Sequence, residues 1–157
     1  MACDVGLGFE GIPTFAEGED LRGGRGSANC ALGPSGIRAW RHTASGIRVV
    51  RFTEPGPLVS VSIIVGTVPW SDAGHPHTLE HIIFLGSSLH PERGYLDTLA
   101  CRCLGNGTNA FTANEYTCYT ASTAGFEGFS HVLPCLLDHV LRPRIDEATF
   151  ASEVYHV

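Results

Sequence analysis

The sequence predicts an α+β domain with a largely antiparallel sheet and helices packed on one face. Short β-branched segments come in pairs, at residues 47–52 and 58–67 and again at 108–113 and 116–122. Segments with an apolar residue every three or four positions follow each pair. Paired strands followed by paired helices are typical of the α+β class, because strands that alternate singly with helices form parallel sheets.

Each predicted strand pair has a turn between its members. Residues 54–57 read Glu-Pro-Gly-Pro, which breaks the first apolar run and predicts a turn that joins segments 47–52 and 58–67 as an antiparallel pair. Asn114 and Glu115 separate the second pair. The sequence therefore predicts two antiparallel strand pairs.

Four segments have helical periodicity. They are residues 76–85, 94–104, 128–141 and 146–157. In the first, Leu79, Ile82 and Ile83 fall on one side of the helix. Asp146 is the expected N-cap of the last helix, because an aspartate at this position accepts a backbone N–H of the first turn.

Composition limits the class of protein. The chain has 157 residues, 43% of them apolar, and a net charge of −6, which suits one domain with a real core and disfavours nucleic acid as a partner. The apolar runs are too short to cross a membrane. Acidic residues near the N-terminus disfavour a secretory signal or a mitochondrial transit peptide, so we expect a cytoplasmic protein whose six cysteines are reduced.

The N-terminal 36 residues differ from the rest of the chain. They are rich in glycine, with Gly-Gly-Arg-Gly-Ser at residues 23–27, and have weak periodicity. We expect residues 1–36 to form a flexible arm. Residues 37–157 then hold the folded part.

The chemistry concentrates in the segment His77-Thr78-Leu79-Glu80-His81. On a helix, residues four apart are neighbours on one face, so His77 and His81 could occupy two corners of a zinc tetrahedron. Glu80 lies beside them and could take a proton from a water that zinc activates. This is the inverted H-x-x-E-H zinc motif.

Residues 74–87 resemble the active-site helix of the pitrilysin/insulysin family of zinc metallopeptidases. Four later segments resemble the same family in order and spacing: residues 95–100, 107–112, 133–143 and 153–156. The resemblance extends over about residues 45–157. It implies a peptidase catalytic domain that hydrolyses peptide bonds with a zinc-activated water.

The resemblance also implies roles for single residues. His77 and His81 would be zinc ligands, and Glu80 the general base. Asn109, Ala110 and Phe111 would line an edge strand on which a peptide substrate pairs its backbone. Glu153 would hold the zinc site in place rather than bind the ion itself.

The family takes its third zinc ligand from a glutamate about two turns beyond the position of Glu153, and this sequence ends four residues after Glu153. We therefore expect residues 37–157 to be the N-terminal part of a catalytic domain, truncated at its C-terminus. Such a fragment should bind zinc weakly and have little activity without the remainder of the enzyme.

Two alternatives stay open. Some S-ribosylhomocysteine lyase-like proteins have about this length and an H-T-L-E-H string, and Cys135 would be the nearest candidate for their cysteine ligand. A non-catalytic structural relative of the peptidases is the other alternative, although the intact motif argues against it.

Overall fold

The computed structural model describes residues 9–12, 37–53 and 55–154. The chain divides into two compact units, Met1–Pro55 and Gly56–Val157, and each unit contains an antiparallel sheet of three strands. The expected division into an arm at residues 1–36 and a catalytic part at residues 37–157 stays a prediction, since residues 13–36 lie outside the described residues. The structure groups residues 37–55 with the N-terminal unit because the strands in this segment pair with each other and not with the sheet that follows.

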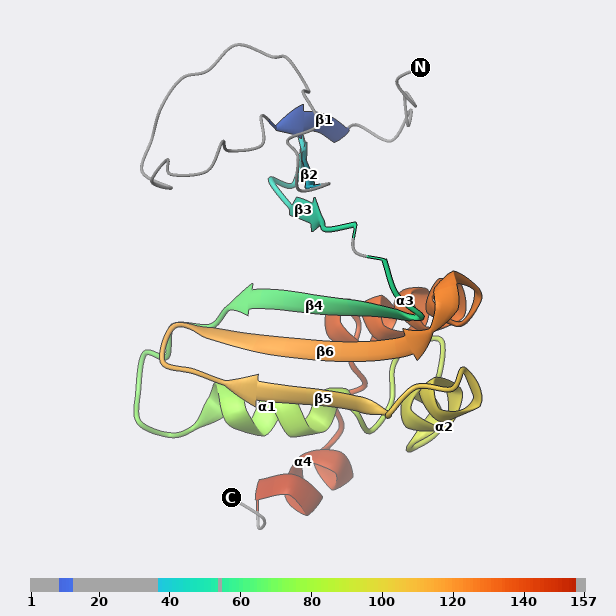
Figure 1. Cartoon of the computed structure of the whole chain (residues 1–157). Coiled ribbons are helices and arrows are strands. Elements are labelled where there is room, and N and C mark those ends of the chain that lie inside the picture. Colours follow the sequence, from blue (N-terminus) through green and yellow to red (C-terminus); the bar gives the residue numbers. More distant parts are fainter. Residues whose placement is uncertain (1–8, 13–36, 54, 155–157) are drawn as a thin grey trace. The chain divides into compact units, whose positions relative to one another are not determined.

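The N-terminal unit has the strand order β1-β2-β3, drawn in Figure 1. The strands are β1 (Phe9–Ile12), β2 (Arg38–His42) and β3 (Arg48–Arg51). Within the arm predicted at residues 1–36, residues 9–12 thus form a strand, whereas residues 1–8 and 13–36 lie outside the described residues.

The predicted pairing of segments 47–52 and 58–67 is wrong. β3 pairs with β2 across a tight turn, in which Gly46 has a φ of 73° and donates its N–H to the His42 carbonyl at 2.8 Å. The two segments do not pair because β2 takes up β3, from Arg38 opposite Arg51 to Arg41 opposite Arg48, and β6 takes up segment 58–66.

The second unit, Gly56–Val157, has a sheet with the order β4-β6-β5. Its strands are β4 (Leu58–Gly66), β5 (Thr108–Thr112) and β6 (Tyr116–Ala124). β4 pairs with β6 from Leu58 opposite Ala124 to Gly66 opposite Tyr116. The predicted pairing of segments 108–113 and 116–122 is confirmed by the antiparallel β5–β6 pair.

The four predicted helices are confirmed. They are α1 (His75–Ile83), α2 (Tyr95–Arg102), α3 (Gly125–Leu141) and α4 (Glu147–Val154). Asp146 caps α4 as expected, since its Oδ1 accepts the Thr149 backbone N–H at 2.8 Å.

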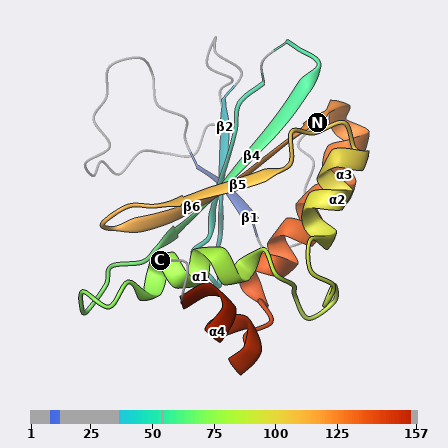
Figure 2. The same cartoon turned by 90° about the horizontal axis from the view of Figure 1, so that it is seen from below.

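One face of the β4-β6-β5 sheet carries the core. Its buried residues come from the sheet and from α1, α2 and α3: Ile83, Leu96, Ala100, Tyr119, Ala121, Val132, Cys135 and Leu136. Figure 2 shows these helices on the same side of the sheet, with α4 next to α1. The predicted class, an α+β fold with an antiparallel sheet and helices on one face, is confirmed.

A buried carboxylate fixes the segment that follows α1. Asp138 on α3 accepts the Leu89 backbone N–H at 3.0 Å and pairs with the Arg142 guanidinium at 2.5 Å. The Ser87 hydroxyl, the Leu89 N–H and Arg142 together hold the pKa of this carboxyl below its usual value of 3.8, although burial opposes them. The loop between α1 and α2 is therefore attached to α3.

Candidate metal centre

Helix α1 begins at His75, directly after a glycine N-cap. Gly74 is the N-cap, with a left-handed φ of 70°, and Pro76 lies in the first turn, where its missing N–H costs no helical hydrogen bond. The buried side chains of α1 are Thr78, Glu80, Ile82 and Ile83. The apolar members of this set anchor the helix in the core and leave His77 exposed.

The two motif histidines face each other. Their Nε2 atoms lie 3.1 Å apart, and the ring planes make an angle of 71°. Two nitrogens bound to one tetrahedral zinc ion lie about 3.3 Å apart, as follows from Zn–N bonds of about 2.0–2.1 Å. The pair thus already has nearly the spacing that zinc requires.

Glu80 completes the group. One ligand atom from each of His77, Glu80 and His81 can be chosen so that all lie within 4.8 Å of one another. Among the residues that the structure describes, no other group of three or more His, Cys, Asp or Glu side chains is close enough to share a metal ion. Neutral imidazoles beside a carboxylate are a donor set that suits zinc.

The edge strand β5 orients the Glu80 carboxylate. Glu80 is only 9% exposed, and its Oε2 accepts a hydrogen bond from the Thr112 hydroxyl at 2.5 Å. The sequence analysis missed this role of Thr112. A signal was present, because Thr112 is two residues from Ala110 and strand alternation puts both on the face toward the helices.

Tyr119 on β6 lies in the same core. Burial, and to a lesser extent the negative charge of Glu80, raises the pKa of Tyr119 to about 12. The phenol therefore keeps its proton at neutral pH and adds no charge near the carboxylate.

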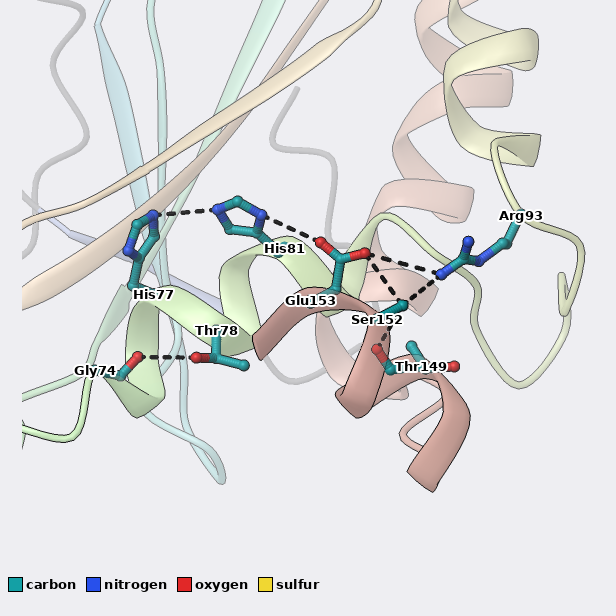
Figure 3. Close-up of polar contacts among 8 residues, drawn as sticks. All are labelled: Gly74, His77, Thr78, His81, Arg93, Thr149, Ser152 and Glu153. Carbon is teal, nitrogen blue, oxygen red and sulfur yellow. Dashed lines mark hydrogen bonds and ion pairs between the residues drawn. The ribbon is translucent and has the colours of Figure 1, made fainter. Parts of the chain in front are cut away.

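Glu153, on α4, lies beside helix α1. Its Oε2 lies 3.3 Å from His81 Nδ1, the ring nitrogen that does not face His77 (Figure 3). A carboxylate at this nitrogen fixes the ring and its tautomer. The structure thus brings Glu153 beside His81, and a role in zinc binding stays a prediction.

Two further residues surround Glu153, and the sequence analysis missed both. Arg93, in the loop between α1 and α2, donates from Nη2 to the Ser152 Oγ at 2.8 Å, and the same nitrogen lies 3.8 Å from Glu153 Oε1. No periodicity or motif identifies these contacts, since Arg93 lies in a loop and Ser152 in an ordinary helical turn.

The predicted substrate strand is an edge strand. β5 pairs with β6 on one side, at the end of the order β4-β6-β5. Asn109 is exposed, and Phe111 is 50% exposed and packs edge-to-face against Tyr116. Ala110 instead packs against the core cluster. The three residues therefore point to different faces of the sheet.

Cys135 does not join the histidine pair. It is buried in α3, where its Sγ lies 3.7 Å from His139 Nδ1. Burial raises the pKa of this thiol to about 11, which opposes the thiolate that a metal ligand must form. The described cysteines are free thiols: Cys101, Cys103, Cys118 and Cys135.

Comparisons with known proteins identify the family. Residues 54–157 match the model of the Insulinase family (peptidase family M16), so the chain belongs to this family. The lyase-like alternative is thereby wrong. A crystal structure of pitrilysin has the same fold, with a TM-score of 0.70 and 22% identity over 94% of this chain and 15% of that one.

Two relatives are similar in sequence. Uncharacterized protein C05D11.1 of Caenorhabditis elegans is 46% identical over 71% of this chain and 11% of its own length. The mitochondrial presequence protease of Danio rerio is 33% identical over the same share of each chain. The present chain therefore spans about a tenth of these relatives. In the described segments, no helix has both the length and the apolarity that a membrane crossing requires.

Proposed function

We propose that this chain is part of a zinc-dependent metalloendopeptidase of the pitrilysin/insulysin type. The observation that carries the proposal is the 3.1 Å separation of the His77 and His81 Nε2 atoms, with the Glu80 carboxylate in the same group. Membership of a peptidase family supports this function. The substrate would be a peptide or polypeptide.

His77 and His81 would hold the ion through their Nε2 atoms. Bound zinc lowers the pKa of a water molecule to about 7 and so supplies a nucleophile at neutral pH. Glu80 would accept the proton of the attacking water at a carboxylate oxygen and return it to the amide nitrogen that leaves. The hydrogen bond from Thr112 to Oε2 would keep the carboxylate turned in one direction.

The open edge of β5 would bind the substrate. An exposed edge strand offers main-chain donors and acceptors to any extended peptide. Asn109 and Phe111 would contact substrate side chains from the exposed face, while Ala110 would keep the strand close to the helices. The hydrogen bond of Thr112 on the same strand would place the paired peptide near Glu80.

A third protein ligand would come from outside the described residues. Catalytic zinc sites commonly have three protein ligands, and the group found here offers His77 and His81 once Glu80 serves as the base. We propose that the remainder of the enzyme completes the site. The 157-residue chain alone should then retain clearly less than one zinc ion after mild dialysis.

The test compares Glu80→Gln with His77→Ala in the whole protein. Glu80→Gln should retain zinc and lose peptide cleavage, whereas His77→Ala should lose both. Zinc content is measured by atomic absorption, and cleavage with a fluorogenic peptide library. Cleavage retained by Glu80→Gln would refute its role as base. A wild-type protein that binds zinc but cleaves no peptide would favour the non-catalytic relative.

The expected cytoplasmic location is tested by fractionating cells.

A further inference from the structure

A series of polar contacts links the loop after α1 to helix α4, which lies beside α1. Arg93 donates to Ser152 Oγ at 2.8 Å, and the Ser152 hydroxyl lies 2.8 Å from the Thr149 carbonyl and 3.3 Å from Glu153 Oε1. The other carboxylate oxygen of Glu153 lies 3.3 Å from His81 Nδ1. Figure 3 shows Arg93, Glu153, His81 and His77 one after another, with Ser152 and Thr149 lower in the view.

The two oxygens of Glu153 point at different groups. Oε1 lies toward Arg93 and Ser152, and Oε2 toward His81. A carboxylate held at both oxygens cannot rotate without losing one contact. The direction of Oε2 therefore depends on the groups that hold Oε1. Glu153 is 16% exposed, so water replaces those groups only in part.

We propose that Arg93 is a positioning residue for the metal centre, which acts with Ser152 to keep Glu153 against His81. The inference rests on the proposed function, because it takes His81 as a ligand. Through Glu153, Arg93 fixes the tautomer in which Nδ1 of His81 carries the proton and Nε2, on the side of His77, keeps its lone pair. Among the described residues, Arg93 forms its hydrogen bond and ion pair with Ser152 and Glu153, and not with His77, His81 or β5.

Charge attraction alone would not give Arg93 this role. Its side chain is 60% exposed, and ion pairs at such exposure contribute little to stability. The role comes from the direction in which the guanidinium holds its partners, because it contacts two adjacent side chains of α4, Ser152 and Glu153. The loop that carries Arg93 is itself attached to α3 through Asp138. A stiff, planar donor suits this geometry better than a flexible amine.

The N-cap of helix α4 does not involve Arg93, so an effect of Arg93 on the position of Glu153 can be told apart from an effect on the folding of α4. Asp146 accepts both the backbone N–H and the hydroxyl of Thr149, at 2.8 and 2.7 Å. These bonds lie within α4 and its cap and do not involve Arg93. Loss of Arg93 should therefore disturb where Glu153 points and leave the helix content of the chain unchanged.

The experiment uses the whole protein with Arg93→Ala, Arg93→Lys and Arg102→Ala, the last being an exposed arginine at the end of α2. Zinc affinity is measured by competition with a chromophoric chelator. Arg93→Ala should weaken it about fivefold to tenfold, near the low end for residues that hold a ligand in place. Arg93→Lys should recover only part of this loss, and Arg102→Ala should bind as wild type.

A second readout needs no metal. The ¹⁵N resonances of the His81 imidazole at pH 8 should shift in Arg93→Ala and stay at their wild-type positions in Arg102→Ala, with equal circular dichroism. Unchanged resonances and unchanged zinc affinity in Arg93→Ala would overturn the inference. If the whole wild-type protein binds no zinc while the His81 resonances respond to Arg93→Ala, the proposed function fails and the positioning role stands.

Discussion

The substitution Thr112→Val tests how the sheet edge holds the Glu80 carboxylate. Valine keeps the shape of threonine and removes the hydroxyl that donates to Glu80 Oε2 at 2.5 Å. A hydrogen bond to a charged group contributes about 1.5–3 kcal/mol, and Glu80 is 9% exposed, so water compensates little. We expect the free energy of unfolding to fall by about 1.5–3 kcal/mol, which lowers Tm by about 3–12 °C.

The assay is urea unfolding at pH 7, followed by circular dichroism in buffer that contains a chelator. Thr120→Val is the matched control, since Thr120 donates to the neutral Asn109 carbonyl at 3.2 Å at an exposed position of the same strand pair. It should cost less than about 1 kcal/mol. Thr112→Val should also cost much less in a Glu80→Ala background. Equal costs for the two valine variants, or in the two backgrounds, would refute the reasoning.

Three other substitutions probe the fold, each by the same unfolding assay. Gly105→Ala should destabilise by about 3 kcal/mol or more, because its Cβ would lie 2.2 Å from the Ser122 carbonyl oxygen; Gly66→Ala, which meets nothing within 4 Å, should not, and equal effects would contradict this packing. Leu136→Ala should cost about 2–5 kcal/mol, since Leu136 is fully buried; a loss below 1 kcal/mol would place it outside the core. Burial lowers the pKa of His139 below 6.5, so the unfolded chain binds a proton first and stability falls as the pH drops below about 6.5. His139→Gln should flatten this fall between pH 7 and 5, and an unchanged slope would assign it to other groups.

Local sequence patterns predicted helix α1 and the β5–β6 hairpin well. The positions of His77 and His81 place them on one face of any helix, and the structure confirms that face. The β5–β6 hairpin was predictable because Asn114 and Glu115 separate two short β-branched runs. In each case the interacting residues are close in the sequence.

Pairings between distant segments could not be predicted in this way. The partner of β4 is β6, about 60 residues later, and the Pro-Gly segment nearby suggested β3 instead. The contact between Arg93 and Glu153 likewise joins a loop to a helix 60 residues away. Such contacts depend on how the elements pack, and one sequence carries no periodic signal for that packing.

The positions of β5 and β6 after α1 in the chain also affect how the chain can fold. Helix α1 packs on β5 and β6, which both follow it in the chain, so it has no sheet to pack against until those strands are present. The pairing of β4 with β6 closes a long loop that contains α1, α2 and β5. Loop closure of this length costs entropy before any packing repays it. On a ribosome, the histidine pair would therefore emerge early and acquire its fixed surroundings only after β6 has been synthesised. Glu153, on the later α4, would reach His81 last.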